Sequence, residues 1–175
     1  MTTTVVYPGT FDPITLGHED VLRRACTLFD RVVVGVAAAH HKKTMFTLAQ
    51  RMDMVTEVLA DVHNLEVKVF DGLVVDFCAA NNAAGVVRGV RNHTDFDFEA
   101  QMAAMNNILS PSFDTIVLLP RPSLQCISST LVREISNLGG DVSALVSPPV
   151  GLALAQAKRM SEQMAAQLSA QALAS

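Results

Sequence analysis

The fold is decided by the stretch Tyr7-Pro8-Gly9-Thr10-Phe11-Asp12-Pro13-Ile14-Thr15-Leu16-Gly17-His18. It follows a β-branched apolar run and precedes a segment with helical spacing, so it predicts a strand, a tight turn and the start of a helix. The first turn of a helix offers free N–H groups and a positive dipole end, which suit a phosphate. Gly9 permits a close backbone approach, and His18 can donate to a phosphate oxygen.

The same alternation of strand and helix continues outward through the chain. A nearly continuous apolar run is typical of a parallel strand that is buried on both faces. The sequence therefore predicts a Rossmann-like, doubly wound α/β domain with five parallel strands and helices on both faces. The expected strands are Thr3–Tyr7, Arg31–Ala38, Leu65–Phe70, Gly85–Val87 and Thr115–Leu119.

The expected helices have apolar faces and capping residues. Thr47 with Gln50 predicts a capping box. Thr94 is a candidate cap for the helix with Met102, and Ser128 or Ser129 is a candidate cap for the helix with Val132. The predicted apolar faces carry Val21, Leu22, Ala25, Leu28 and Phe29; Met52, Val55, Leu59 and Val62; Met102, Met105 and Leu109; and Leu131, Val132 and Ile135.

The length of 175 residues fits one domain. We expect residues 1–160 to form it, and residues 161–175, rich in Ala, Gln and Ser, to form a helical extension or a flexible tail.

Composition limits the function classes. The formal net charge of -4 disfavours binding to nucleic acid or to an anionic membrane through bulk charge, so any anion site must be local. No targeting segment is evident, and the apolar stretch Val32–Ala39 is too short to span a bilayer. Cys26, Cys78 and Cys126 are far apart and lack metal-ligand spacing, which favours reduced thiols in a cytoplasmic protein.

Anion-suited clusters follow three further strands. They are His40-His41-Lys42-Lys43, Arg88-Gly89-Val90-Arg91, and Pro120-Arg121-Pro122 with Ile127-Ser128-Ser129-Thr130-Leu131-Val132-Arg133. Each has an ordinary alternative: a solvated loop for the first, an ion pair of Arg88 with Asp95, Asp97 or Glu99 for the second, and helix capping for the hydroxyls of the third. Because parallel strands end at one edge, all the clusters are expected to converge on one rim of the sheet.

Other nucleotide and hydrolase motifs are missing from the sequence. It has no GxxxxGK[ST], no GxGxxG after the first strand, no GxSxG and no HExxH. A P-loop protein and a dinucleotide-binding oxidoreductase are therefore disfavoured.

Two of these stretches resemble a known superfamily. The segment Tyr7–His18 and the segment Ile127–Arg133 resemble the two signatures of the nucleotidyltransferases with a (His/Thr)-x-Gly-His motif. Between them, Lys42–Phe46, Arg88–Arg91 and Asp95–Asn106 are similar to the bacterial phosphopantetheine adenylyltransferases. The resemblance covers about Val5 to Leu154, with Thr44, Val90, Phe98 and Ala39-His40-His41 departing from the usual residues.

The resemblance implies roles for the matching residues. His18 would stabilise the transition state at the α-phosphate, with Lys42 and Arg91 also in the reaction. The acceptor would contact Thr10, Lys42, Val74 and Arg88. ATP would contact Thr10, Phe11, His18, Gly89, Val90, Arg91, Glu99, Leu124, Gln125, Cys126, Ile127, Ser128, Ser129 and Thr130.

The resemblance also implies a reaction in coenzyme A biosynthesis. ATP and 4′-phosphopantetheine would give dephospho-coenzyme A and pyrophosphate by in-line attack of the acceptor phosphate on the α-phosphate. Mg²⁺ would be the cofactor, and because it keeps most of its waters, few protein ligands are expected. A cytoplasmic homohexamer and feedback by coenzyme A are implied as well.

Three other functions stay open at this point. The same chemistry could act on nicotinamide mononucleotide or a polyol phosphate, against which Lys42, Arg88 and residues 95–106 argue. A catalytically silent nucleotide-binding domain is disfavoured by the intact Thr15-x-Gly-His18. A generic Rossmann oxidoreductase lacks its glycine motif.

Overall fold

A computed structural model describes residues 2–38 and 43–173. The elements in chain order are β1 (Thr4–Gly9), α1 (Leu16–Leu28), β2 (Arg31–Ala37), α2 (Leu48–Val58), β3 (Leu65–Phe70), α3 (Val74–Ala80), β4 (Gly85–Gly89), α4 (His93–Leu109), β5 (Asp114–Leu118), the short 3₁₀ helix η1 (Pro122–Leu124), α5 (Ser129–Asn137) and α6 (Pro148–Leu173). The predicted alternation of strands and helices is confirmed.

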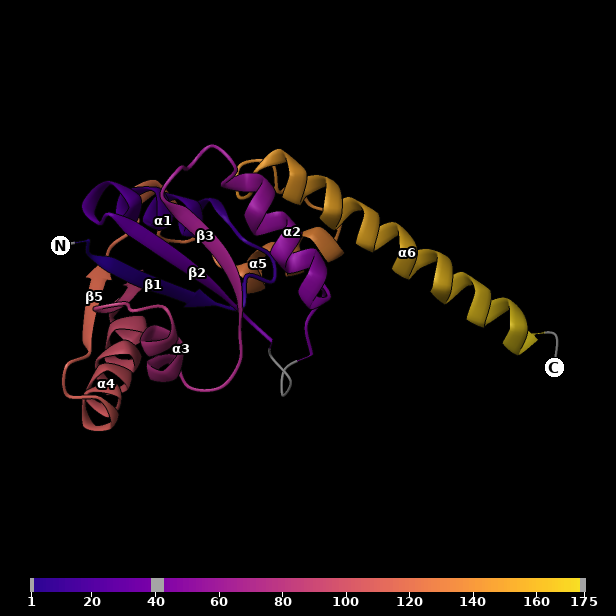
Figure 1. Ribbon diagram of the computed structural model, residues 1–175. Helices are drawn as coiled ribbons and strands as arrows, with labels where there is room; N and C mark the ends of the chain where they lie inside the picture. Colours follow the sequence, from indigo (N-terminus) through magenta and orange to yellow (C-terminus); the bar gives the residue numbers. More distant parts are fainter. Residues whose placement is uncertain (1, 39–42, 174–175) are drawn as a thin grey trace.

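The strands form one parallel sheet in the order β3-β2-β1-β4-β5 (Figure 1). The chain thus moves outward from β1 in one direction, returns, and moves outward in the other, with the switch point between β1 and β4. The predicted fold class, a five-stranded doubly wound α/β domain, is confirmed.

Side chains alternate along the central strands and build a core on each face of the sheet. Val5 and Val34 pack in the core that α1, α2, α5 and α6 cover, whereas Val6 and Val33 pack on the side of α3. Figure 1 shows α3 and α4 together on one side of the sheet. Because β1 and β2 are buried on both faces, their sequences are almost wholly apolar.

Two predicted strands end later than the sequence indicated. Strand β1 continues to Gly9 because Pro8 and Gly9 stay in register with Gly35 and Val36 of β2. Strand β4 continues to Gly89 in register with Leu118 of β5. Arg88 is therefore part of strand β4 and does not follow it.

The helix starts agree with the sequence in two cases and differ in one. Thr47 and Gln50 form the predicted capping box of α2, and Ser128 caps α5 by accepting from the Leu131 N–H. The prediction for Thr94 was wrong, because Asn92 caps α4 and accepts from the Asp95 N–H. The helix therefore begins two residues earlier than predicted, and the Asn side chain satisfies a free donor of its first turn.

The predicted apolar faces also need correction at three helices. In α5, Leu131 is 48% exposed. Leu28, the last residue of α1, is 61% exposed. In α4, Met105 and Leu109 are exposed and Asn106 is the buried residue. In α2 the buried residues are Arg51, Met54, Val55 and Val58, with Leu59 directly after the helix.

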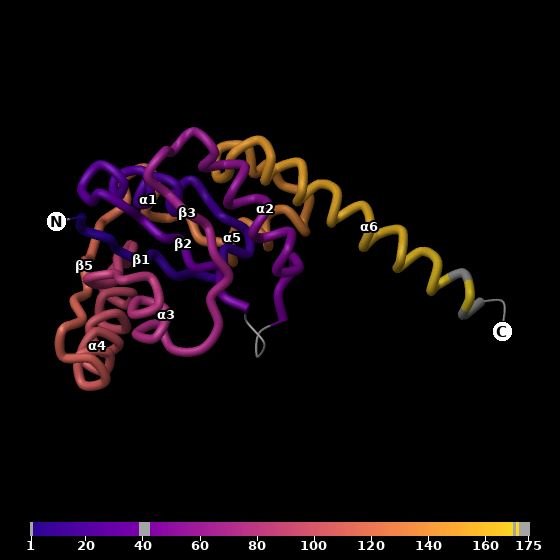
Figure 2. The backbone as a smooth tube through the Cα atoms, viewed as in Figure 1, coloured from indigo at the N-terminus to yellow at the C-terminus, as the bar shows by residue number. Residues whose placement is uncertain are grey.

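The C-terminal helix α6 is continuous across residue 160. Its first turns bury Val150 and Leu154 in the core, whereas residues 159–169 are all exposed. The ribbon and the tube both show its distal half projecting away from the domain (Figures 1 and 2). In the described ranges, 2–38 and 43–173, no helix combines the length and hydropathy needed to cross a membrane.

The burial of α6 predicts where its contribution to stability lies. Leu154→Ala should lower the free energy of unfolding by about 2–5 kcal/mol, because it leaves a cavity in the core. The matched change Leu168→Ala, on the exposed part of the same helix, should alter it by less than about 0.5 kcal/mol. Urea unfolding of both variants measures the difference, and equal effects would contradict the described packing of α6.

Candidate active site

A pocket of about 740 Å³ lies at the carboxyl ends of β1 and β4, at the switch point. This volume is typical of a site for a nucleotide-sized ligand. Four of the segments singled out in the sequence meet there. The predicted residues that line it are Thr10, Phe11, His18, Gly89, Arg91, Glu99, Ile127, Ser128, Ser129 and Thr130.

The turn after β1 forms the floor of the pocket. Phe11 has a φ of 51°, and its buried ring folds back over Gly9. A Cβ at position 9 would lie 2.9 Å from the Phe11 ring, so only glycine fits under it. This packing sets the path of the backbone at Thr10, between the strand and the helix.

His18 is held by the cap of α1. Thr15 is the N-cap, and the Thr15 N–H donates to Nδ1 of His18 over 3.1 Å, which closes a capping box. Since Nδ1 accepts this hydrogen bond, the neutral ring carries its hydrogen on Nε2. The cap thus fixes both the ring orientation and the tautomer of His18.

The surroundings of His18 also favour the neutral form of its imidazole ring. Burial, with a smaller contribution from the nearby Arg91 guanidinium, lowers the pKa of His18 to about 4. The imidazole is therefore neutral at pH 7. It can donate a hydrogen bond from Nε2 to an anion without adding a full charge to the site.

Two arginines of the pocket region are each paired with a carboxylate of α4. Arg88 Nε lies 2.9 Å from Glu99, and Arg88 Nη1 donates to the Pro8 carbonyl over 3.0 Å. Arg91 Nε lies 2.9 Å from Asp95, and its Nη1 donates to the Ile127 carbonyl. The ion-pair alternative considered for Arg88 is thus realised with Glu99. Burial is the main cause of a raised Glu99 pKa, which Arg88 partly offsets.

The start of α5 is fastened to the turn after β1. Ser129 donates to the Pro13 carbonyl over 2.8 Å, and Arg133 donates to the Asp12 carbonyl and lies 3.4 Å from its carboxylate. Ser128 caps the helix, and Thr130 accepts from Arg133. Each of the three hydroxyls therefore has a protein partner, which the capping argument from sequence did not foresee.

Other predicted site residues do not line the pocket. Arg88 and Val90 lie on or directly after β4, and Val74 begins α3. Leu124, Gln125 and Cys126 belong to η1 and the turn that precedes Ile127. Lys42, with His40 and His41, lies outside the described residues.

Several residues of the site lie in the predicted segments but were given no individual role from the sequence. Lys43 and Thr44 line the pocket on the side where α2 begins, and Asp12, Thr15 and Arg133 line it near the first turn. A Thr three residues before His18 was a readable capping signal. Arg51, which is buried beneath the turn, interrupts the apolar stripe of α2, and that interruption was its only signal.

The donors of the pocket can bind an anionic ligand, although the three carboxylates Asp12, Asp95 and Glu99 line it together with its cations. Lys43, Arg91 and Arg133 line it, and the N-termini of α1 and α5 both open onto it through His18 and Ser129. In the described ranges no group of three His, Cys, Asp or Glu residues gathers as metal ligands. The arrangement can orient phosphates and stabilise charge on them.

Comparison with known proteins places this geometry in a family. The cytidylyltransferase-like family matches residues 6–135. The phosphopantetheine adenylyltransferase of an Acidovorax strain (JS42) is 59% identical over 145 residues, which cover 83% of this chain and 88% of the relative. That of Bordetella pertussis is 51% identical over 161 residues, covering 91% and 95%.

The chain belongs to the phosphopantetheine adenylyltransferase family. A more distant likeness supports the fold alone. The structure of a Plasmodium falciparum nicotinic acid mononucleotide adenylyltransferase has a TM-score of 0.66 at 15% identity, covering 88% of this chain and 94% of that one. The match to the cytidylyltransferase-like family contains both predicted signature segments, Tyr7–His18 and Ile127–Arg133, in full.

The cap of α1 predicts the titration of His18. Nitrogen NMR of the labelled imidazole should show the Nε2–H tautomer and a midpoint below pH 5, because protonation would disrupt the bond from the Thr15 N–H. His63, an exposed residue in the turn before β3, serves as the reference signal in the same spectrum. A His18 midpoint near 6.5, or an Nδ1–H tautomer, would contradict the described cap.

Proposed function

We propose that this chain transfers the adenylyl group of ATP to 4′-phosphopantetheine and releases pyrophosphate. The observation that carries the proposal is the neutral His18, presented by the α1 cap at the floor of a nucleotide-sized pocket. The relatives at 50–59% identity, which carry the name of this activity, support the choice of substrates.

The proposed reaction is a single in-line displacement. A phosphate oxygen of the acceptor attacks the α-phosphorus of ATP, and a new P–O bond forms as the bond to the bridging oxygen of the β-phosphate breaks. The electron pair of that bond leaves with pyrophosphate. The nucleophile is already anionic at neutral pH, so the protein needs no catalytic base.

The barrier is then mainly one of charge and alignment. We assign His18 to the α-phosphate, where its Nε2–H donates to an oxygen that gains charge in the transition state. Arg91, Ser128, Ser129 and Thr130 are assigned to the β- and γ-phosphates of the leaving group. Their existing bonds to Asp95, Ile127 and Pro13 hold these groups in place before ATP binds.

The acceptor is assigned to the side of the pocket away from Arg91 and the start of α5. Lys42 and Arg88 would neutralise and aim its phosphate, Thr10 would contact it at the turn, and Val74 would line the pantetheine arm. Lys43 lies on the pocket wall and supports a positive rim on this side. Gly89, Val90, Glu99 and the segment from Leu124 to Ile127 complete the proposed ATP site.

We place Mg²⁺ on the phosphate oxygens of ATP. The three carboxylates that line the pocket, Asp12, Asp95 and Glu99, are each engaged by an arginine, and Mg²⁺ readily keeps several water ligands. When bound, the ion would neutralise part of the charge on the leaving pyrophosphate.

A homo-oligomer is proposed for the same protein. Helix α4 exposes Phe96, Phe98, Met105, Ile108 and Leu109, each more than half exposed in a single chain. An apolar surface of this kind is typical of a subunit interface. The hexamer and the feedback by coenzyme A implied by the resemblance remain predictions.

The test of the proposed function is a pyrophosphate-release assay with the product identified by mass. Release from ATP should depend on 4′-phosphopantetheine and yield dephospho-coenzyme A. Release only with nicotinamide mononucleotide or another phosphorylated acceptor would reassign the acceptor side. ATP binding without release for any acceptor would show a silent nucleotide-binding domain and overturn the proposal.

Removal of the His18 ring predicts a loss in the chemical step. His18→Ala should lower kcat by about a hundredfold or more, as for the loss of one transition-state donor. The KM values should change much less, because ground-state contacts from the arginines and the α5 turn remain. His63→Ala, outside the pocket, is the control and should keep full activity. Unchanged kcat with raised KM values would refute the assigned role.

A further inference from the structure

Arg51 of α2 carries a buried guanidinium that no role above uses. The residue is 1% exposed, yet it does not line the pocket. Its donors reach four backbone carbonyls. Nε donates to Phe46 over 3.3 Å, Nη1 donates to Thr10 and to Ala37 over 2.7 Å each, and Nη2 donates to Ala38 over 3.4 Å.

These carbonyls belong to three segments that are distant in the sequence. Thr10 is in the turn after β1, Ala37 and Ala38 end β2, and Phe46 directly precedes the cap of α2. One planar side chain therefore joins the carboxyl ends of β1 and β2 to the segment around Phe46 that leads into α2. The bond to Thr10 lies directly beneath the turn that forms the pocket floor.

Asp12 binds the same segment through its backbone N–H groups. Its carboxylate accepts the N–H groups of Met45 and Phe46, both over 2.9 Å, and lies 3.4 Å from Arg133. The backbone at Phe46 is thus bound through its N–H by Asp12 and through its C=O by Arg51. Lys43, three residues before it, lines the pocket.

Stability alone is a poor explanation for this arrangement. Desolvating a guanidinium costs several kcal/mol, and an apolar side chain on the buried stripe of α2 would avoid that cost. An apolar side chain would not bind carbonyls from three segments at once. A planar fork with five donors does so, and a lysine ammonium, with a single nitrogen, does not span them.

We propose that Arg51, together with Asp12, is a positioning residue for adenylyl transfer. It fixes Thr10 and the 43–46 segment relative to each other, and so sets the acceptor side of the pocket against the ATP side. This inference rests on the proposed function. Arg51 acts through Thr10 and Phe46 and touches no substrate.

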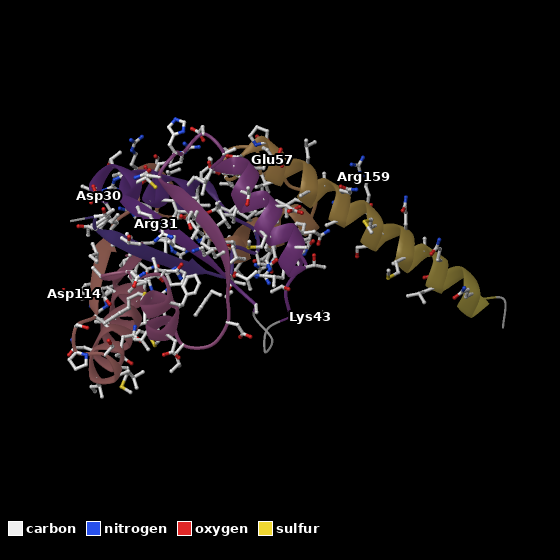
Figure 3. All side chains as sticks on the ribbon, in the orientation of Figure 1. Asp30, Arg31, Lys43, Glu57, Asp114 and Arg159 are labelled. Carbon is white, nitrogen blue, oxygen red and sulfur yellow. The ribbon has the colours of Figure 1, made fainter. Side chains whose placement is uncertain are left out.

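The test compares two conservative changes on arginines at opposite ends of β2. Arg51→Lys removes the fork beneath the pocket. Arg31→Lys removes a similar fork, to Glu66 and the Asn81 carbonyl, at the start of the strand. Figure 3 shows Arg31 at the end of the sheet opposite to Lys43. Both variants keep the charge, so they differ in the place of the lost bonds.

We expect Arg51→Lys to lower kcat/KM for 4′-phosphopantetheine by about tenfold to a hundredfold, as for a small misplacement of reacting groups. The Kd of a non-hydrolysable ATP analogue should change by less than about threefold, since Arg91 is held by Asp95 and the Ile127 carbonyl, which Arg51 does not contact. Amide exchange at Met45 and Phe46 should accelerate in this variant alone. Arg31→Lys should keep wild-type kinetics.

Two results would overturn the positioning role. One is wild-type acceptor kinetics in Arg51→Lys despite faster exchange at Met45 and Phe46. The other is a fall in kcat/KM for the acceptor that is matched by an equal weakening of ATP-analogue binding, with the same pattern in Arg31→Lys when it loses a similar amount of stability. If Arg51→Lys fails to fold, Asp12→Asn takes its place. It weakens the bonds to Met45 and Phe46 and also the ion pair with Arg133, so kcat/KM for 4′-phosphopantetheine is the readout. A fall of at least about tenfold is expected, and its absence would overturn the role. An inactive wild-type chain would instead overturn the proposed function, and this role with it.

Discussion

The pairing of β1 with a parallel strand on each side is the constraint on which the rest of the structure depends. Strand β1 pairs with β2 over six residues and with β4 on its other edge, so its backbone is satisfied and its side chains are buried on both faces. The backbone can turn only after the paired part of the strand has ended. The turn Thr10–Thr15 is thereby forced to lie where β4 also ends, and the site follows from that meeting of strands.

The groups around the pocket are arranged before any ligand binds. Arg88, Arg91 and Arg133 each have a carboxylate partner, in Glu99, Asp95 and Asp12. His18 is kept neutral and oriented by the cap of α1. Such preorganised donors need little rearrangement as charge develops, which is the main way a protein can accelerate a transfer between two anions.

Much of this site could be predicted from local sequence. The apolar strands, the turn after β1 and the Ser128 cap of α5 carry signals over a few residues, and their secondary structure was predicted correctly. Gly9 and His18 could be assigned to a phosphate-suited turn because strand, turn and helix are adjacent in the chain. The ion pair of Arg88 was also foreseen as an alternative, since an arginine at a buried strand needs an anion.

The parts that could not be predicted depend on contacts between distant segments. Strand order is decided by which edges pair, and no local pattern encodes it. Leu28 fits the apolar period of α1, yet it lies at the exposed last residue of the helix. Arg51 bonds to Thr10, which is 41 residues away, and a charged residue within an apolar stripe does not by itself indicate its partners.

The central claim is that the protein supplies only position and charge, and that no side chain forms a bond to the nucleotide. The stereochemical course at the α-phosphorus tests this most directly. With ATP made chiral at that phosphorus, a single in-line displacement predicts inversion of configuration in dephospho-coenzyme A. Retention would mean two successive displacements through an adenylylated residue, and would contradict the account.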